Sequence, residues 1–387
     1  MSAYHYVILG AGRQGTAAAY DLAVQGQAQS ILICDIDEEQ ARKSANRVNV
    51  LVGQKICASK KVEVTDNNAL KQAINGAHAV LSAVPYKFNL QITRIAIESG
   101  VHFCDMGGNT AIVKEQLKLD SEAQHAGISI VPDCGMGPGL INTVAAYAME
   151  LLDEPEEIYI FDAGLPQKPV PPWNYELTFH INGLTNEMDG QAVFIRDGKI
   201  AYIDTLTEPE MIDIPQLGRF EADVTSGGTS TAPWSFLGKV KTYENKVFRY
   251  PGHFEWLRAY KTLGLFSQEP IEVDGQSIIP RQVYHTLLLP KIEKEDIRDI
   301  GIIRVIGKGR KNNRQTTVTI DMVDRYDPAT GFTAMERLTG WHCSVMMYFQ
   351  ASGRIASGAI PQELAVPAAE FMQALSERGI EHEIAFE

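Results

Sequence analysis

The feature that most constrains this chain is a glycine-rich turn close to its N-terminus. The apolar run at residues 7–9 leads into Gly10, Gly12 and Gly15, and a small-residue helical pattern follows. In a dinucleotide-binding turn the first glycine permits the bend, the second lets the backbone approach a pyrophosphate, and the third lets the helix pack on its strand. The helix N-terminus directs free N–H groups and its positive dipole end at the phosphates. We therefore predict a nicotinamide-cofactor site that comprises Gly10, Ala11, Gly12, Arg13, Gln14 and Gly15.

An acidic residue stands where such a turn requires one. A second apolar run, residues 30–34, ends in Asp35, which lies 20 residues beyond Gly15. An acid at this distance bonds the ribose hydroxyls of the cofactor. Asp35 and Asp37 would repel a 2′-phosphate, so the sequence favours NAD over NADP, although Arg13 or Arg42 could still reach the site. The alternative, a glycine turn of an unrelated α/β protein, is disfavoured by the strand before the turn, the helix after it and the acid.

Charge and cysteine content exclude several classes of function. The 387 residues include 35 basic and 48 acidic side chains, a formal net charge of -13. This argues against nucleic acid as a partner and gives weak support to a cationic substrate, while the simpler interpretation is that acidity maintains solubility. Five scattered cysteines without a C-x-x-C pair predict no metal site, no disulfide framework and a reducing compartment. Since we find no apolar leader and no membrane-length run, we expect a cytoplasmic protein without membrane contact.

The first part of the chain alternates strands and helices in the rhythm of a parallel sheet. Helical patterns at residues 38–48, 67–74, 88–99 and 112–125 separate the strand candidates. The six strand candidates are residues 7–9, 30–34, 55–64, 79–83, 102–104 and 128–131. This is the arrangement of a doubly wound Rossmann sheet, and we assign residues 1–132 to an NAD(P)-binding domain.

Beyond Pro132 strands dominate and the connections lengthen. A glycine loop at residues 133–139 leads into a helix at 140–152. Alternating and β-branched patterns in the later strands predict an antiparallel or mixed sheet. We assign residues 133–340 to an α+β substrate domain and 341–387 to helices that return to the first domain. The expected strands are 157–162, 175–181, 192–195, 200–203, 240–248, 302–307 and 315–323, with helices at 281–289, 338–350 and 368–378.

Three segments follow strands of the predicted parallel sheet and should meet at its ligand-binding edge. They are residues 82–89, 105–110 and 133–139, which are rich in glycine and proline. Loops at strand ends carry function disproportionately often, although tight turns alone would use the same residue types. We expect cofactor contacts from Ala83, Val84, Pro85, Gly107 and Met136.

Three clusters in the second domain are candidates for the substrate site. The P-P-W-N-Y segment at residues 171–175 is a rigid aromatic loop, either a pocket wall that includes Tyr175 or a surface turn. The T-S-G-G-T-S-T segment at 225–231 offers hydroxyls and backbone N–H groups for a carboxylate, or is a plain polar loop. The R-Y-P-G-H-F-E segment at 249–255 places Arg249, His253 and Glu255 in a predicted turn. Arg249 could hold a carboxylate and His253 could act as a base, although a single histidine is more often structural.

Taken together, these segments resemble the saccharopine-dehydrogenase-like oxidoreductases nearly end to end. The motifs that carry the resemblance are Y-K-F-N at residues 86–89, D-M-G-G at 105–108, P-D-C-G-M-G-P-G-L-I-N at 132–142 and the three clusters named above. The loops around Trp173, Trp234 and Trp256 depart from the family pattern. The resemblance implies a Rossmann domain, an inserted α+β domain for substrate binding and dimerisation, and a homo-oligomer, which we expect to be a homodimer or larger.

Within the family the chain is most similar to members that oxidise the ε-amine of L-lysine. This likeness implies conversion of L-lysine and NAD to 2-aminoadipate 6-semialdehyde, ammonia and NADH, with cyclisation of the aldehyde to piperideine-6-carboxylate. On this hypothesis His253 is the base, with Glu255 as second candidate. The α-carboxylate would be held by Arg249 and the loop that includes Thr225 and Ser226, and Asp133 or Glu255 would pair with the α-ammonium.

Two other interpretations remain open. The first is a saccharopine or carboxyspermidine-type reductase that joins an amine to an aldehyde with NADPH. It requires a larger pocket and a basic partner for the 2′-phosphate, which Asp35 and Asp37 disfavour. The second is a sensor that binds NAD without reducing it with any amine; the intact strand-end loops and the dense polar second domain disfavour this interpretation.

Overall fold

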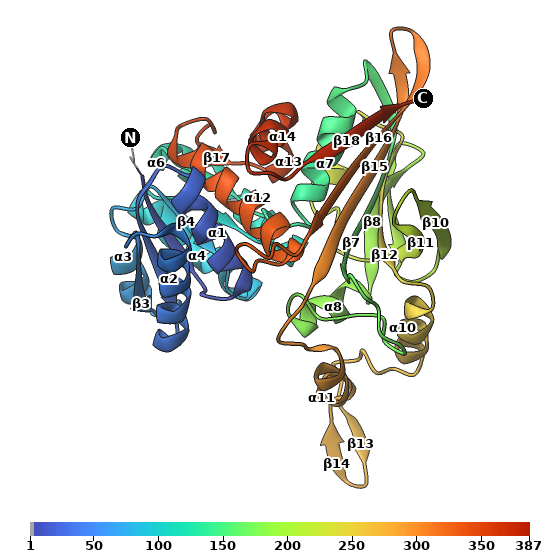
Figure 1. The fold of residues 1–387 in the computed structure, drawn as a ribbon, viewed down its shortest axis with the longest axis horizontal. Helices are drawn as coiled ribbons and strands as arrows, with labels where there is room; N and C mark the ends of the chain where they lie inside the picture. The colour runs from blue at the N-terminus through green and yellow to red at the C-terminus, as the bar shows by residue number, and fades with distance from the viewer. Residues whose placement is uncertain (1–3) are drawn as a thin grey trace.

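A computed structural model describes residues 4–387 as two β-sheet domains joined by a long helix (Figure 1). The N-terminal domain, drawn in blue, lies beside a tall sheet drawn in green to orange. Helix α12 (Ala334–Ala351) lies between them. It packs on β4 (Ala79–Ser82) and β5 (His102–Asp105) of the first domain and on β15 (Asp299–Lys311) and β16 (Arg314–Arg325) of the second. The C-terminal part of the chain therefore connects both domains.

Within the described residues the N-terminal domain contains one seven-stranded parallel sheet of order β17-β6-β5-β4-β1-β2-β3. The order changes direction between β1 and β4, the switch point at which such sheets bind ligands. The six strands predicted from the sequence are present, and the predicted doubly wound fold is confirmed. The strands are β1 (Tyr4–Leu9), β2 (Ala28–Asp35), β3 (Cys57–Lys61), β4 (Ala79–Ser82), β5 (His102–Asp105), β6 (Ser129–Val131) and β17 (Gly358–Ala359).

The helices of this domain cover both faces of the sheet (Figure 1). One expectation is wrong: residues 112–125 form two helices instead of one. The Leu119 N–H bonds the Gln116 carbonyl at 3.0 Å, a three-residue spacing that interrupts the α-helical ladder between them. The helices are α1 (Arg13–Gln25), α2 (Glu38–Val52), α3 (Asn67–Ile74), η1 (Tyr86–Phe88), α4 (Asn89–Ser99), α5 (Thr110–Leu117) and α6 (Asp120–Ala126).

The second domain is built on a mixed sheet, as predicted, with nine strands among residues 4–387. Its main path is β10-β11-β12-β7-β15-β16-β18, in which β12 and β7 are parallel and the other neighbours antiparallel. The strands are β7 (Glu154–Pro166), β8 (Gln191–Arg196), β9 (Lys199–Asp204), β10 (Glu210–Ile214), β11 (Gly218–Val224), β12 (Thr242–Arg249), β15 (Asp299–Lys311), β16 (Arg314–Arg325) and β18 (His382–Phe386).

Helix α11 and a separate two-stranded hairpin project from the lower end of this domain (Figure 1). The hairpin pairs β13 with β14 in antiparallel register. The helices here are α7 (Leu140–Glu150), α8 (Ile181–Glu187), α9 (Ala232–Phe236), α10 (His253–Thr262) and α11 (Pro280–Ile292), and the hairpin strands are β13 (Ile271–Val273) and β14 (Gln276–Ile278).

Two sequence-based assignments in the second domain are wrong. Residues 175–181 were expected to be a strand, but they are irregular up to the start of α8, because Tyr175 and Leu177 bury their side chains in the domain core. The segment 249–255 was expected to be a turn, but α10 begins at His253 directly after Gly252, whose φ of 93° is left-handed. At both places the tertiary structure overrides the conformation that the local sequence pattern favours.

The chain returns to the first domain after residue 333 and then leaves it again. The expected boundary at residue 340 falls inside α12, and β17 extends the parallel sheet beside β6. Helix α14 (Ala368–Ser376) packs on α7, and β18 pairs with β16 in the second sheet. The short helix α13 (Gln362–Ala365) lies between β17 and α14 along the chain.

All five cysteines are buried and unbridged. Across residues 4–387, no group of three or more His, Cys, Asp and Glu side chains is placed to hold a metal ion. No helix in the described range is both long enough and apolar enough to cross a membrane.

The contact between α12 and α1 depends on a helical glycine, Gly340. A Cβ atom at this position would lie 2.8 Å from the Ala17 Cβ and the Ala18 nitrogen, and 2.9 Å from the Gln14 carbonyl oxygen. Two of these neighbours are backbone atoms of α1, which cannot move away by a side-chain rotation. The close approach of the two helices therefore requires glycine.

We predict that Gly340→Ala destabilises the protein. Overpacking of this kind costs about 1–3 kcal/mol, whereas glycine to alanine inside an unconstrained helix stabilises by about 1 kcal/mol. Denaturant unfolding monitored by circular dichroism measures the change in midpoint. Ala259→Gly on the exposed side of α10 is the control, since it changes helix propensity alone. A higher midpoint for Gly340→Ala would contradict the proposed packing.

Candidate active site at the domain seam

The three glycines of the N-terminal turn have separate structural roles, as predicted from their spacing. Gly10 has a φ of 106°, and a Cβ there would overlap the backbone of Ala83 at the end of β4. A Cβ at Gly15 would overlap the Gly10 carbonyl oxygen. At Gly12 a Cβ would meet nothing within 4 Å of the described chain. The first and third glycines close the turn, and the second leaves open space beside the backbone.

The N-terminus of α1 is suited to an anion. Gly12 is the N-cap, no side chain of the described chain caps the helix, and its first turn contains no acidic residue. The first N–H groups of a helix need partners, and a phosphate at this position supplies acceptors where the dipole is positive. The turn therefore fits the pyrophosphate of a dinucleotide.

Asp35 is tied to the glycine turn by hydrogen bonds. Its two carboxylate oxygens accept from the Ala11 N–H at 2.8 Å and the Asp37 N–H at 3.0 Å. The register of β2 and β3 places Lys61 opposite Asp35, a neighbour that sequence spacing alone did not reveal. Arg42 donates three hydrogen bonds to Glu39. The site thus contains a fixed acid with Lys61 opposite it on the adjacent strand.

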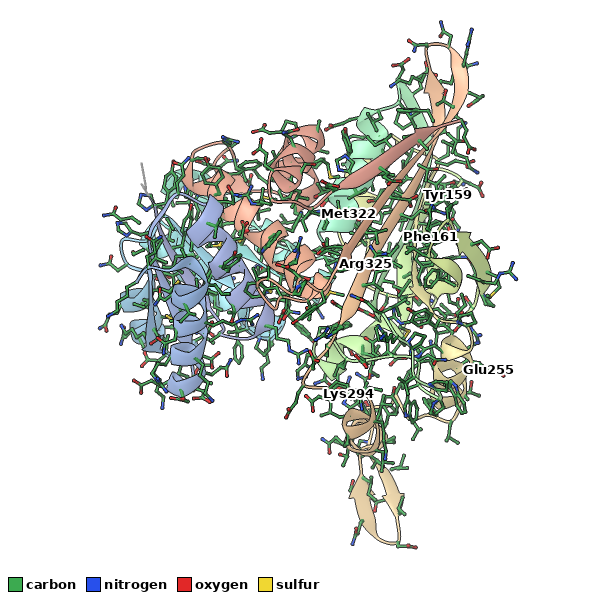
Figure 2. The ribbon with its side chains drawn as sticks, viewed as in Figure 1. Tyr159, Phe161, Glu255, Lys294, Met322 and Arg325 are labelled. Atoms are coloured by element: carbon green, nitrogen blue, oxygen red, sulfur yellow. The ribbon has the colours of Figure 1, made fainter. Side chains whose placement is uncertain are left out.

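Arg13 and Gln14 reach toward the second domain. The Arg13 guanidinium donates to the Lys294 carbonyl at 3.4 Å, and the Gln14 amide donates to the Thr178 carbonyl at 3.3 Å. Lys294 lies at the lower end of the second domain, on the side nearer the first (Figure 2). The predicted cofactor turn therefore faces the second domain, and we call the region between them the domain seam.

One buried carboxylate, Asp105, fixes the loops that follow β5 and β6. Its oxygens accept from the Gly107 N–H at 2.7 Å, the Asp133 N–H at 3.1 Å and the Gln116 amide at 2.7 Å. Burial raises the pKa of Asp105, and these hydrogen bonds oppose that shift. The predicted strand-end segments, which include Ala83 directly after β4, do meet at one edge of the sheet.

The loop at residues 134–139 is held from behind by residues that the sequence analysis missed. His342 of α12 contacts the Cys134 carbonyl through Nδ1 at 2.8 Å, and Gln362 of α13 donates to the Gly139 carbonyl at 3.0 Å. Met136, a predicted cofactor contact, turns its side chain into the hydrophobic core and is 4% exposed. Only the backbone of Met136 is therefore available at the seam.

The second domain places a charged cluster over this loop, formed by Asp162, Glu187, Asn245 and Arg249. Asp162 lies on β7, and its Oδ2 would be 3.5 Å from a Cβ built at Gly137. The Asn245 amide donates to Asp162 Oδ1 at 2.8 Å, and Arg249 Nη2 lies 3.5 Å from Glu187 Oε2. Of these four residues the sequence analysis identified only Arg249. The signal for Asp162 was an acid that directly follows the apolar run at residues 158–161 of its strand.

Burial shifts the protonation of both carboxyl groups toward neutral pH. It raises the pKa of Asp162 to about 6, against the opposing effects of the Asn245 hydrogen bond and the Arg249 charge. It raises the pKa of Glu187 to about 7, where Arg249 opposes the shift and Asp162 adds to it. Glu187 keeps 27% of its side chain exposed, so it remains accessible. Both groups can exchange a proton near pH 7.

Arg249 is buried but retains free donors. Nη1 donates to the Phe248 carbonyl at 2.9 Å, and the guanidinium lies 5.1 Å from the centre of the Tyr175 ring. Nε has no hydrogen-bond partner within residues 4–387. A buried guanidinium with an unpaired N–H is expected to bind an acceptor such as a carboxylate.

The hydroxyl-rich loop at residues 225–231 mainly joins the two domains. Ser230 donates to Asp133, and Thr231 donates to Glu363 at 2.9 Å. Ser226, a predicted substrate contact, instead bonds the Asn186 carbonyl at 2.6 Å, and Thr225 is 2% exposed. The hydroxyls of Ser226, Ser230 and Thr231 are thus bonded within the protein, and Thr225 is buried.

Asp133 lies in the seam but is fully enclosed. It is 1% exposed, its Oδ2 accepts from Ser230, and no described residue partners Oδ1. Burial raises its pKa well above the ordinary value, Asp105 raises it further, and Ser230 opposes the shift. A carboxyl group in this state is a poor partner for an ammonium group at neutral pH.

The structure does not bring the two predicted bases together at the seam. Glu255 lies on the exposed side of α10 at the outer edge of the second domain (Figure 2). His253 is 7% exposed and lies behind Tyr175, with the two rings 5.1 Å apart. Burial, together with the charge of Arg249, lowers the pKa of His253 to about 3. Asp162 and Glu187 are better placed and better matched in pKa.

Two family profiles match the chain in succession. The profile described as "Saccharopine dehydrogenase NADP binding domain" matches residues 6–131, and "Saccharopine dehydrogenase C-terminal domain" matches residues 135–380. The chain belongs to the saccharopine dehydrogenase family. The family resemblance seen in the sequence is confirmed.

Relatives from this family are distant in sequence. The chain is 22% identical over 249 residues to saccharopine dehydrogenase [NADP(+), L-glutamate-forming] of Saccharomyces cerevisiae, covering 61% of this chain and 54% of that protein. It is 22% identical over 306 residues to carboxynorspermidine synthase of Vibrio cholerae, covering 72% and 71%. The chain thus spans about half the length of the saccharopine dehydrogenases it matches.

A solved structure shows the same fold. The apo saccharopine dehydrogenase (L-Glu forming) from Saccharomyces cerevisiae superposes with a TM-score of 0.80 at 18% identity, with all of both chains covered. The two-domain architecture described above is therefore the architecture of this saccharopine dehydrogenase.

The open space at Gly12 allows a specific test of the cofactor site. We predict that Gly12→Ala leaves the melting temperature unchanged, because the added methyl group meets no atom and the φ of -72° suits any residue. NADH binding should weaken by about tenfold or more, since the methyl group occupies the path of the pyrophosphate. NADH fluorescence titration and differential scanning calorimetry measure the two effects.

Gly15→Ala is the matched control, because its methyl group would overlap the Gly10 carbonyl and lower the melting temperature. Unchanged NADH affinity in a folded Gly12→Ala variant would show that the dinucleotide does not lie at this turn.

Proposed function

We propose that the protein is an NAD-dependent amine dehydrogenase that deaminates the ε-amine of L-lysine, an L-lysine 6-dehydrogenase. The observation that carries this proposal is the position of Asp162, a carboxylate directed at the glycine loop at the ligand-binding edge of the Rossmann sheet. Beside it Arg249 offers a free buried N–H. Removal of hydride from C6 leaves an imine, and water hydrolyses this imine to ammonia and 2-aminoadipate 6-semialdehyde, which cyclises; NADH is the other product.

The names of the relatives support an amino-acid substrate of this type. They include saccharopine dehydrogenase, carboxynorspermidine synthase and the rat alpha-aminoadipic semialdehyde synthase. The proposed product is the semialdehyde that the last of these names contains. The homo-oligomer and the cytoplasmic location expected from the sequence remain predictions.

The residues that would hold the cofactor fit a dinucleotide. The open backbone at Gly12 and the uncapped start of α1 suit the pyrophosphate, and Asp35 suits the ribose hydroxyls. The loops after β4, β5 and β6 would contact the nicotinamide end, through Ala83–Pro85, Gly107 and the backbone at Met136. When bound, nicotinamide supplies the acceptor for the hydride.

The charged cluster can orient an amino acid that carries a second amine. Arg249 binds the α-carboxylate through its free Nε–H, which satisfies a buried donor. Asp162 lies at the loop edge, where it can receive the ε-ammonium. The two groups are on neighbouring strands β12 and β7, so the substrate chain lies across the strands.

Proton removal is the step that the protein must promote. An ε-ammonium has no lone pair to stabilise the positive charge that develops at C6 as hydride leaves, so it must first be deprotonated. Asp162 accepts this proton, and Glu187, next in the cluster, exchanges it with solvent because it is partly exposed. Carboxyl groups with a pKa near 6 or 7 suit this role better than His253.

A second candidate function follows from the relatives. A saccharopine or carboxynorspermidine-type reductase would use the same seam to form a secondary amine with NADPH. The NADP-binding family profile and Lys61 beside Asp35 favour this alternative. Substrate and cofactor preference therefore distinguish the two reactions.

We predict that Asp162→Asn lowers kcat for L-lysine by about 10²–10⁴-fold, the usual contribution of a general base. Asparagine keeps the oxygen that accepts from Asn245, so the fold should persist. In the wild type, kcat should rise with pH between about 5 and 8, because Asp162 and Glu187 are active when ionised and burial raises both pKa values. The variant should lose this rise.

NADH absorbance at 340 nm measures both rates. Glu272→Gln on the exposed hairpin is the control, and it should behave as wild type. Full activity of Asp162→Asn with the wild-type pH profile would show that another group takes the proton.

We predict that kcat/KM with NAD exceeds that with NADP by about tenfold or more, because Asp35 bonds the ribose and repels the 2′-phosphate. Asp35→Ser should reduce or invert this ratio, since it removes the acid opposite Lys61. Initial rates with each cofactor at fixed lysine give the ratio. A wild-type preference for NADP would favour the reductase alternative.

A further inference from the structure

Asn245 is a buried amide beside Asp162, and the proposed reaction assigns it no role. Asp162 lies opposite Val247 in the register of β7 and β12. Asn245 and Arg249 therefore flank it along β12, on the same face of the sheet. Asn245 is 1% exposed and donates to Asp162 Oδ1 at 2.8 Å. Within residues 4–387 it is the one hydrogen-bond donor to this carboxyl group.

Two acceptors fix the orientation of the Asn245 amide. Its Nδ2 lies 2.8 Å from Asp162 Oδ1 and 3.5 Å from the Ile160 carbonyl oxygen. A carbonyl cannot donate, so the atom that faces it is the nitrogen, and both N–H groups of the amide are used. An amide turned by half a rotation would direct its oxygen at two other oxygens. The amide is therefore held with its donors toward β7.

The other end of the amide is closed by the loop at residues 225–231. Asn245 Oδ1 is buried and has no hydrogen-bond partner in the described part of the chain. A Cβ built at Gly228 would overlap this oxygen and would lie 3.2 Å from Asn245 Cγ, so the glycine backbone packs against the amide. A buried acceptor without a partner is unfavourable and rare. We attribute its presence to the donor end of the same amide, which serves Asp162.

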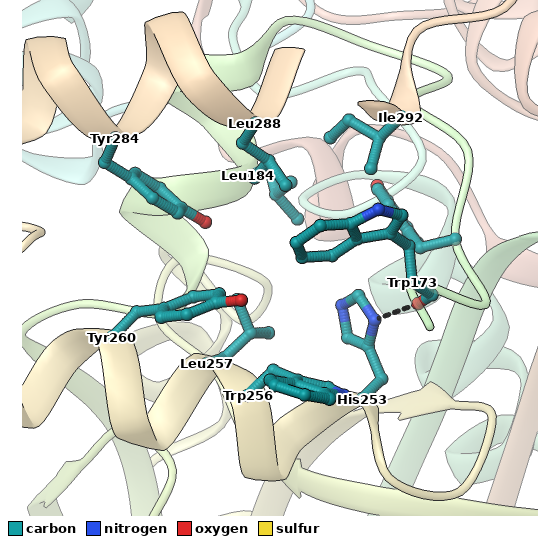
Figure 3. Close-up of a pocket in the computed structure, with 10 residues that line it drawn as sticks. Trp173, Leu184, His253, Trp256, Leu257, Tyr260, Tyr284, Leu288 and Ile292 are labelled. Atoms are coloured by element: carbon teal, nitrogen blue, oxygen red, sulfur yellow. Dashed lines mark hydrogen bonds between the residues drawn. The ribbon is translucent and has the colours of Figure 1, made fainter. Parts of the chain in front are cut away.

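His253, the base expected from the sequence, does not share this contact with Asp162. Its Nδ1 lies 2.9 Å from the Trp173 carbonyl oxygen, in a narrow cavity lined by aromatic and aliphatic side chains (Figure 3). Neither Asp162 nor Asn245 lines that cavity. The histidine ring is therefore bonded elsewhere, and Asn245 is the group that holds Asp162.

The two oxygens of Asp162 have different surroundings. Oδ1 accepts from Asn245, whereas Oδ2 faces the loop at residues 134–139 and lies 3.5 Å from a Cβ built at Gly137. Asp162 is half-buried, and among residues 4–387 no donor bonds its Oδ2. The free oxygen is thus on the side of the domain seam.

We propose that Asn245 is a positioning residue that gives the two oxygens of Asp162 separate tasks. Oδ1 is held by the amide, and Oδ2 receives the proton of the substrate ammonium. The identity of that substrate rests on the proposed function. Because a hydrogen bond to a carboxylate favours its charged form, the amide also keeps Asp162 able to accept a proton. Asn245 acts only through Asp162, since an amide neither gains nor loses a proton near pH 7.

The groups around Asp162 give this hydrogen bond a measurable effect on pH dependence. Burial raises the pKa of Asp162 to about 6, and the Asn245 hydrogen bond opposes this shift more than the charge of Arg249 does. Glu187 on α8 is the other titratable neighbour, and Asp162 helps to raise its pKa. Strand β15 and the loop at residues 134–139 contribute no charged side chain here. Loss of the amide should therefore raise the pKa of Asp162 further and shift activity to higher pH.

Asn245→Leu tests the proposal, because leucine has the branching of asparagine but no N–H group. We expect the midpoint of the rise of kcat with pH to move upward by about one pH unit or more, the effect of one hydrogen bond to a charged group. At pH 7 kcat should fall by about tenfold, while NADH affinity stays within about twofold of wild type. A lower melting temperature with the wild-type midpoint would show a merely structural role and overturn the proposal.

Tyr243→Phe is the matched control. Tyr243 lies two residues from Asn245 on the same face of β12, and its hydroxyl bonds Asn142 at 2.8 Å, so the midpoint should not change. Gly228→Ala is a second variant for the case that leucine prevents folding. Its Cβ would overlap Asn245 Oδ1 and displace the amide from Asp162, so the midpoint should move upward as well. A wild-type midpoint in this variant would contradict the proposed role of the amide.

A titration without turnover separates this proposal from the proposed function. Protein with carbon-13 in its aspartate carboxyl groups is titrated by NMR without lysine, and the signal absent from Asp162→Asn identifies Asp162. Its midpoint should be higher in Asn245→Leu than in the wild type by about one pH unit, and unchanged in Tyr243→Phe. Equal midpoints in the wild type and Asn245→Leu would overturn the positioning role. A raised midpoint in a protein that does not oxidise lysine would support that role and reject the proposed reaction.

Discussion

The arrangement of the seam depends on the hydrogen bonds of one buried carboxylate, Asp105. It holds the loop after its own strand through Gly107 and the loop after β6 through the Asp133 N–H. Asp133 in turn accepts from Ser230 of the second domain. Asp105 and Asp133, linked by a hydrogen bond, therefore connect the sheet edge of one domain to the other domain. Low dielectric around both groups makes these bonds strong, and it makes the loss of either partner costly.

The fold constrains which groups can act as a base. Burial disfavours the charged form of any residue, so it raises the pKa of carboxylic acids and lowers that of histidine. At the seam, burial therefore brings the pKa values of Asp162 and Glu187 close to neutral pH and lowers the pKa of His253 far below it. Histidine, whose pKa in water suits a general base, is thus a poorer base here than the two carboxyl groups. His253 is instead a neutral acceptor fixed by the Trp173 carbonyl.

The sequence predicted the features that depend on local chemistry. The glycine turn, the acid at Asp35 and the six parallel strands follow from spacing and hydrophobic pattern, and the structure contains them. The family resemblance also followed from short motifs. The charged cluster could not be predicted in this way, because Asp162, Glu187 and Asn245 lie on β7, α8 and β12 and approach one another only through sheet register.

The errors have the same origin. Residues 175–181 were assigned to a strand, but the Tyr175 ring packs in the core beside Arg249 and the segment is irregular. Lys61 is 26 residues from Asp35 in sequence but pairs with it across β2 and β3, so local charge alone was an incomplete guide to cofactor choice. Ser226 was predicted to contact the substrate, but its hydroxyl donates a hydrogen bond to the Asn186 carbonyl.

The central claim is that hydride leaves C6 of lysine at the seam, and isotope transfer tests it most directly. Wild-type protein would be incubated with L-lysine deuterated at C6 and with NAD, and the products examined by mass spectrometry and an ammonia assay. The account predicts one deuterium in each NADH and one ammonia for each NADH formed. Reduced cofactor without deuterium, or turnover restricted to saccharopine with NADP, would contradict it.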